Sequence, residues 1–179
     1  MKEKIINAKR YKEIWKEISF KKGTSIIDIG GREGYLIKFA AKGFQGSYRN
    51  FDILDGNDIS NQVKKEFIGM FDYVIFSHAI EHLENAGNAL ENVRKLMKED
   101  GKLIILVPNC LSIRKIVRNI LGLQLESYGK FETHLASYNK ESLSYLLERK
   151  GYNIQKIKFI DQLCSFFGVF SEEILIVAK

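Results

Sequence analysis

The residues best suited to bind a ligand lie in a glycine-rich turn near the start of the chain. An apolar run that ends on Asp28 is followed by Gly30, Gly31 and Gly34. Glycines let the backbone pass close to a ligand where a Cβ atom would clash. A helix that begins after such a turn directs its unpaired N–H groups and its positive dipole end at the same place. The pattern is the first half of a nucleotide-binding βαβ unit.

A second acidic residue, Asp52, closes the short strand expected next along the chain, about two dozen residues after Asp28. A carboxylate at this position can accept hydrogen bonds from both hydroxyls of a ribose. The alternative is a turn or cap role, which aspartate often fills after a strand. In combination with the glycine turn the ribose role is favoured. The same carboxylate would repel the 2′-phosphate of NADP.

The spacing of the glycines argues against a dinucleotide site. Such a site needs the pattern G-x-G-x-x-G. Counted from Gly30, its second and third glycine positions hold Arg32 and Tyr35, and the frame that starts at Gly31 fails as well. A Tyr-x-x-x-Lys pair is also missing, so a nicotinamide-dependent oxidoreductase is disfavoured.

Strands and helices alternate along the chain around these residues. Phe71–Ser77 is almost continuously apolar, as expected at the centre of a covered parallel sheet. The expected strands are Ser25–Ile27, Ser47–Phe51, Phe71–Ser77, Lys102–Val107, Tyr152–Ile160 and Glu173–Ala178. The expected helices are Ile5–Ile18, Tyr35–Phe39, Ala86–Lys98, Ser112–Leu121 and Asn139–Lys150. This order predicts an α/β protein with a central, mostly parallel sheet.

Composition sets outer limits on the function. With 179 residues, 45% of them apolar, the chain has enough material for one folded domain. We therefore predict a single domain over 1–179, with an N-terminal helical segment at 1–22. The net charge of +6 is spread among acidic residues, so nucleic-acid binding is disfavoured. The two cysteines lack metal-ligand spacing, and neither a signal peptide nor a membrane span is visible, which predicts a cytoplasmic protein.

Thr24–Phe39 resembles the first motif of class I S-adenosylmethionine-dependent methyltransferases, an apolar strand that ends in D-x-G-x-G-x-G. Asp28, Gly30 and Gly34 match this motif, and Arg32 replaces its middle glycine. The guanidinium of Arg32 either reaches the carboxylate of the cofactor's methionine part or points to solvent.

A longer stretch, 71–109, resembles the same family's fourth strand, the helix after it and the fifth strand. The family has an F-D-x-V strand, then E-H-apolar, a helix ending in L-K-x-G-G, and a strand ending in P-N. Here Met97 stands for that leucine and Asp100 for the first glycine of the pair. The resemblance extends over 24–179. It implies a three-layer Rossmann-like fold whose sheet is mostly parallel and whose last strand is antiparallel.

The resemblance implies S-adenosylmethionine as cofactor. Asp28 would orient the turn and the methionine end, and Asp52 would hold the ribose. Asp58 would bond the adenine amino group with Ile59 packed on the ring, unless Asp58 instead caps a helix that runs through Phe67. The predicted cofactor-binding residues are Asp28, Gly30, Gly31, Arg32, Gly34, Asp52, Ile53, Asp58, Ile59, Ser77 and His78.

Three further residues bear on catalysis. Glu81 and His82 are adjacent, and two adjacent ligands are too few for a metal, so no metal site is predicted. In relatives of this type such a pair mostly shapes the floor of the site. His134 is the first candidate for a substrate-facing base or donor, and its alternative is a structural bond to a backbone carbonyl.

The acceptor is expected to lie against 109–139, an insertion on the substrate side. The arrangement of motifs there is similar to that of family members from bacterial sugar and cell-surface biosynthesis, which implies a small-molecule acceptor such as a sugar or glycan precursor. No N-P-P-Y motif follows the strand 71–77, and no prolyl-cysteine nucleophile is present, so enzymes that methylate nucleic-acid bases are disfavoured. The alternative function is a degenerate, non-catalytic S-adenosylmethionine-binding module acting in a complex.

Overall fold

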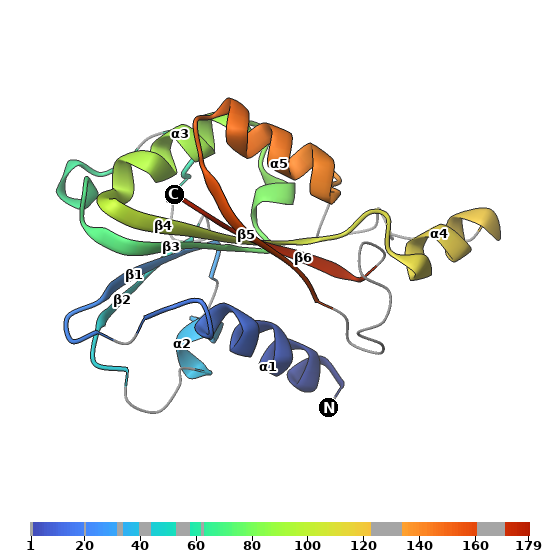
Figure 1. The fold of residues 1–179 in the computed structure, drawn as a ribbon, viewed down its shortest axis with the longest axis horizontal. Helices are drawn as coiled ribbons and strands as arrows, with labels where there is room; N and C mark the ends of the chain where they lie inside the picture. Colours follow the sequence, from blue (N-terminus) through green and yellow to red (C-terminus); the bar gives the residue numbers. More distant parts are fainter. Residues whose placement is uncertain are drawn as a thin grey trace.

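A mixed β-sheet runs through the middle of the computed structural model (Figure 1). The structure describes residues 2–19, 21–31, 34–39, 44–52, 58–61, 63–122, 134–160 and 171–179. Within these ranges six strands follow the order β2-β1-β3-β4-β6-β5. Their bounds are β1 Ser25–Ile29, β2 Ser47–Phe51, β3 Phe71–Ser77, β4 Met97–Pro108, β5 Ile154–Ile160 and β6 Glu173–Ala178.

The sheet is parallel from β2 to β4 and antiparallel where β6 pairs with β4 and β5. This confirms the predicted Rossmann-like α/β fold with an antiparallel last strand. In the parallel part, Asp28 of β1 lies opposite Asn50 of β2 and Ile75 of β3. The carboxyl ends of these strands therefore meet at one edge of the sheet, where ligands bind in such folds.

Helices cover both faces of the sheet (Figure 1). α3 (Ala86–Leu96) and α5 (Lys140–Arg149) lie on one face, and α1 (Lys2–Trp15) and α2 (Tyr35–Lys38) lie on the other. Alternate residues of each strand face the two layers. The first layer buries Leu90, Leu96, Leu143, Leu147, Val74 and Phe76, and the second buries Ile14, Trp15, Leu36, Ile26 and Ile75.

The boundary between α3 and β4 differs from the prediction. The helix ends at Leu96 rather than Lys98, and β4 begins at Met97 rather than Lys102. The pairing of β3 with β4 is irregular between Met97 and Lys102, and the chain folds closely there: a Cβ on Gly101 would lie 2.9 Å from the carbonyl oxygen of Lys98. Helical periodicity continues past Leu96 in the sequence, but the backbone has already become extended.

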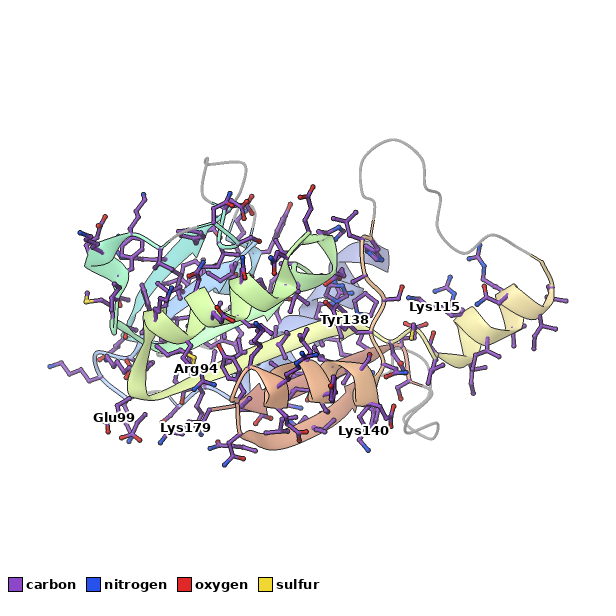
Figure 2. All side chains as sticks on the ribbon, turned by 90° about the horizontal axis from the view of Figure 1, so that it is seen from above. Arg94, Glu99, Lys115, Tyr138, Lys140 and Lys179 are labelled. Atoms are coloured by element: carbon purple, nitrogen blue, oxygen red, sulfur yellow. The ribbon has the colours of Figure 1, made fainter. Side chains whose placement is uncertain are left out.

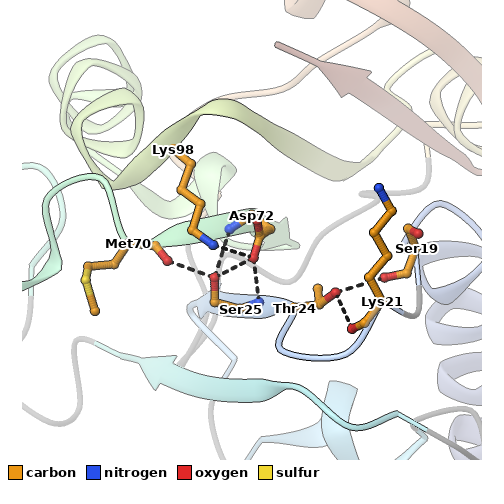
Figure 3. Close-up of polar contacts among 7 residues, drawn as sticks. All are labelled: Ser19, Lys21, Thr24, Ser25, Met70, Asp72 and Lys98. Atoms are coloured by element: carbon orange, nitrogen blue, oxygen red, sulfur yellow. Dashed lines mark hydrogen bonds and ion pairs between the residues drawn. The ribbon is translucent and has the colours of Figure 1, made fainter.

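A polar cluster of Ser25, Asp72 and Lys98 connects the amino ends of β1, β3 and β4 (Figure 3). The backbone N–H of Ser25 donates to Asp72 Oδ2 at 2.8 Å, and Lys98 Nζ donates to the same oxygen at 2.8 Å. Burial alone would raise the pKa of Asp72, but the bonds from Lys98 and Ser25 outweigh it and hold that pKa below its ordinary value. The cluster holds the three strands in register from the end of the sheet opposite the glycine turn.

The insertion at 109–139 contains α4 (Ile113–Ile120), which projects from the sheet in two perpendicular views (Figures 1 and 2). Ser112 caps this helix by accepting from the N–H of Lys115. None of its residues is buried. No helix in the described ranges is long and apolar enough to cross a membrane.

Candidate active site

Two buried carboxylates stand at the ends of adjacent strands. Asp28 is the fourth residue of β1, and Asp52 directly follows β2; their exposed fractions are 2% and 4%. The strands are joined beyond these residues by the N–H of Gly30, which donates to the carbonyl of Phe51 at 2.9 Å. The fold therefore places both predicted acids at the carboxyl edge of the sheet.

The environment of Asp28 is unusual for a carboxyl group. Burial raises its pKa to about 7; the hydroxyl of Tyr48, which donates to Oδ2 at 2.7 Å, opposes this rise, and the charge of Asp52 adds to it. Its other oxygen, Oδ1, is buried and has no hydrogen-bond partner among the described residues. A buried acceptor without a donor is costly, so this atom is suited to receive one from a ligand. Tyr48 was not singled out from the sequence.

The glycine turn has no room for a side chain at Gly30 or Gly31. Gly30 and Gly34 have φ angles of 72° and 67°, in the left-handed region that favours glycine. A Cβ on Gly30 would lie 2.6 Å from the Cβ of Ala79, and one on Gly31 would lie 2.5 Å from Asp28 Oδ2. The turn thus packs directly on the segment after β3. Arg32, which replaces the motif's middle glycine, lies outside the described residues.

Asp58 and Ile59 form a turn instead of the start of a helix. Asp58 Oδ1 accepts from the N–H of Ser60 at 2.8 Å, and its Oδ2 accepts from Asn61 Nδ2 at 2.7 Å. The alternative in which Asp58 caps a helix through Phe67 is therefore wrong: the described residues between them form a turn and a short 3₁₀ helix, η2 (Lys65–Phe67). Ile59 is buried, and the adenine contact of this pair stays a prediction. Ile53 lies outside the described part of the chain.

Ser77 ends β3, and His78 follows with a φ of 53°, which is rare for a residue other than glycine. The ring of His78 lies between two carboxylates: Nδ1 is 3.4 Å from Glu81 Oε1, and Nε2 is 3.3 Å from Glu173 Oε1. Burial lowers the pKa of His78, but the two carboxylates outweigh it and leave the pKa above its ordinary value. Its predicted contact with the cofactor stays a prediction.

Glu173 was missed from the sequence, although it is an acid at the start of the apolar strand β6. Arg10 of α1 donates from Nε to Glu173 Oε1 at 3.0 Å, and His78 lies against the same oxygen. Burial raises the pKa of Glu173, but the bonds from His78 and Arg10 lower it by more, so the pKa lies below its ordinary value. This carboxylate joins α1, β6 and the segment after β3.

We expect Glu173→Gln to lower the free energy of unfolding by about 2 kcal/mol, because it removes the charge that the Arg10 guanidinium and the His78 ring face. The value is below that of a fully buried pair because the Arg10 side chain is 18% exposed and can turn toward solvent. Urea denaturation measures the change. Glu172→Gln is the matched control: its partner Arg114 is 3.7 Å away and mostly exposed, so the expected change is within about 0.5 kcal/mol. Equal losses in both variants would refute a special role for Glu173.

Glu81, His82 and His134 come together, which adjacency in the sequence did not reveal. Glu81 and His82 belong to a 3₁₀ helix, η3 (Ile80–His82), and the rings of His82 and His134 are 4.7 Å apart between centroids. The N–H groups of Leu135 and Ala136 donate to the carbonyl of Glu81 at 2.8 and 3.1 Å, which brings His134 to this place. His134 thus adds a third ligating side chain to the adjacent pair Glu81 and His82. A catalytic role of His134 stays a prediction.

Comparisons with known proteins agree with this geometry. A family model described as a methyltransferase domain matches residues 3–157. No curated protein sequence matches the chain significantly. Among solved structures, a SAM-dependent methyltransferase from Aquifex aeolicus has a TM-score of 0.64 at 13% identity, covering 94% of this chain and 88% of its own. One from Archaeoglobus fulgidus has a TM-score of 0.61 at 18% identity, covering 98% and 93%.

A third similar structure is the trans-methyltransferase CalH in complex with SAH (S-adenosylhomocysteine), with a TM-score of 0.62 at 18% identity. The match covers 87% of this chain and 51% of CalH. At these identities the structures establish the fold, and the family model, which spans most of the chain, establishes the family. S-adenosylmethionine is the methyl donor of this family. The chain belongs to the methyltransferase domain family and is an S-adenosylmethionine-dependent methyltransferase domain.

Proposed function

We propose that the chain binds S-adenosylmethionine at the carboxyl ends of β1 and β2 and transfers its methyl group to a small-molecule acceptor. The observation that supports this most strongly is a glycine turn, tightly packed at Gly30 and Gly31, beside two buried carboxylates, Asp28 and Asp52. Oδ1 of Asp28 has no hydrogen-bond partner among the described residues, and the cofactor carries a suitable donor in the cationic amino group of its methionine part. The residues present therefore fit the cofactor.

The roles of the other residues follow from their places. Gly30, Gly31 and Gly34 would allow close approach, and Asp52 would accept hydrogen bonds from the ribose hydroxyls. Further contacts are proposed for Asp58 and Ile59 at the adenine, for Ser77 and His78 at the pocket wall, and for Arg32 and Ile53. When bound, the cofactor supplies a methyl group already activated by its sulfonium. The protein then has mainly to orient two reactants and exclude water.

The acceptor is proposed to be a sugar or glycan precursor. Support comes from the 109–139 insertion, where α4 carries Arg114, Lys115 and Arg118 and projects beside the carboxyl edge of the sheet (Figure 2). Basic side chains suit a phosphate or carboxylate of such a precursor. His134, at the end of the same insertion, would face the acceptor as base or donor.

Calorimetric titration with S-adenosylhomocysteine, beside NAD and NADP, tests the cofactor assignment. We expect micromolar binding of S-adenosylhomocysteine alone. Methyl transfer from labelled S-adenosylmethionine to sugar nucleotides, with oligonucleotides as comparison, then tests the acceptor class. Binding without transfer to any acceptor would support a non-catalytic cofactor-binding module, and absence of binding would refute the proposed function.

A further inference from the structure

A cluster of three metal-ligating side chains lies beside the glycine turn. Glu81, His82 and His134 each offer one ligand atom, and these atoms all lie within 4.8 Å of one another. A cation held at about 2.1 Å from each ligand would bring the ligand atoms to roughly 3.4 Å apart. The contraction this requires is small enough for side-chain rotations to supply. The cluster thus has the donor types and the approximate size of a metal site.

The carboxylate of Glu81 is a second observation that favours a cation at this place. The residue is 1% exposed, and neither carboxylate oxygen has a hydrogen-bond partner among the described residues. The ring of His78 lies against this carboxylate, with Nδ1 3.4 Å from Oε1. A buried charge this poorly matched is costly, and a divalent cation on its open side would remove the cost.

The backbone holds the cluster together without help from a metal. The η3 helix fixes Glu81 beside His82, and the N–H of His82 donates to the carbonyl of Ala79 at 3.1 Å. The two bonds from Leu135 and Ala136 to the Glu81 carbonyl attach the His134 segment to this helix. The ligand set is therefore assembled from two distant parts of the chain by main-chain contacts.

We propose that Glu81, His82 and His134 bind a divalent transition-metal cation, such as Zn²⁺, Mn²⁺ or Co²⁺. Two imidazoles and one carboxylate suit these ions, whereas Mg²⁺ and Ca²⁺ prefer oxygen ligands alone. Three protein ligands leave coordination positions open. The metal site is inferred from these three side chains alone and does not depend on the proposed methyl transfer.

The location gives the cation a role, and this second step rests on the proposed function. With the cation bound, His134 is its ligand, and the cation takes the place of the base or donor role given to His134 above. Ala79, two residues before Glu81, packs on Gly30 of the turn that would hold the methyl donor. A hydroxyl oxygen on an open position of the cation loses its proton to water more readily, because the bound cation lowers the pKa of that hydroxyl. The oxygen then forms a bond to the methyl carbon as the carbon–sulfur bond breaks and its electron pair stays on sulfur. The acceptor is accordingly a hydroxyl compound.

Direct binding tests the site without reference to activity. The whole chain, freed of metal with a chelator, is titrated with Zn²⁺, Mn²⁺ and Co²⁺ by calorimetry, with Mg²⁺ for comparison, and Co²⁺ is followed by visible absorption. We expect micromolar binding of at least one transition metal, weakened at least tenfold in Glu81→Gln and in His134→Ala. Glu84→Gln is the matched control, because Glu84 is an exposed acid on the same segment outside the cluster.

Folding of each variant is checked by circular dichroism in the absence of metal. Since His134 is only partly buried, His134→Ala provides the test even if Glu81→Gln does not fold. The metal site would be refuted if none of the transition metals bound at concentrations of about 100 μM. It would also be refuted if Glu81→Gln, His134→Ala and the control Glu84→Gln bound the metal with equal affinity.

Titration of the same samples with S-adenosylhomocysteine separates the two proposals. Metal binding without S-adenosylhomocysteine binding would refute the proposed function and leave the metal site standing. Binding of both, with transfer to hydroxyl acceptors unaffected by the chelator, would overturn the role given to the cation.

Discussion

We expect Asp52→Ala to weaken binding of S-adenosylhomocysteine about 100-fold. The carboxylate is buried at the end of β2, where it would accept hydrogen bonds from the ribose. Hydrogen bonds to a charged group contribute about 1.5–3 kcal/mol each, and about 2.7 kcal/mol corresponds to a factor of 100 in affinity. Calorimetry at pH 7.5 measures the change.

Asp100→Ala is the control for the loss of a negative charge. Asp100 is an exposed acid in β4 that pairs with Lys179, and it lies near the amino end of that strand, away from the site. Its replacement should leave the affinity unchanged within a factor of about two. If Asp52→Ala weakens binding less than threefold, Asp52 does not hold the ribose.

The second large effect concerns Asp28, and it depends on pH. The pKa of this carboxyl rises from 3.8 to about 7 in the folded protein, chiefly through burial. Between these values the folded chain binds more protons than the unfolded chain, so the free energy of unfolding falls as the pH rises. Above pH 7 the buried, ionised carboxylate lowers the free energy of unfolding by roughly 4 kcal/mol at most. An asparagine at position 28 stays neutral and does not cause this loss.

We therefore expect Asp28→Asn to raise the free energy of unfolding of the ligand-free protein by roughly 2–4 kcal/mol at pH 8, by less than half of that at pH 5, and to change it little at pH 3. Urea denaturation across this range measures the difference. Cofactor affinity should fall, because the amide carries no charge for the amino group of the methionine part. Tyr48→Phe is the companion variant: without the donor at Oδ2, the pKa of Asp28 rises further. An unchanged pH dependence in Asp28→Asn would contradict the assignment.

Local patterns were sufficient to predict the main elements of the fold. Phe71–Ser77 and Glu173–Ala178 have the bounds expected from their apolar runs, because burial on both faces leaves a clear signal in the sequence. The end of α3 was misplaced because the backbone is already extended at Met97, a change that the apolar periodicity does not record. Asp58 closes a turn with the same side-chain bonding that a helix cap would use, so its residue type did not decide between them.

The polar parts of the site were harder to predict. Asp28 and Asp52 lie at the ends of two strands. Because parallel strands bring their carboxyl ends together, the closeness of these two residues could be predicted from the sequence. The meeting of His134 with His82 depends on the path of the chain between them. The same holds for Arg10 and His78 on Glu173, since no local pattern encodes a contact between α1 and β6.

The place of β6 has a consequence for how the protein is made. This strand follows β5 in the sequence but lies between β4 and β5 in the sheet. During synthesis β5 therefore has no neighbouring strand to pair with until β6 has left the ribosome, although β1 to β4 can already pair. Until then the hydrogen-bonding edge of β4 stays open, and edges of this kind recruit other chains. The nascent protein thus passes through a stage in which aggregation competes with closure of the sheet by its last strand.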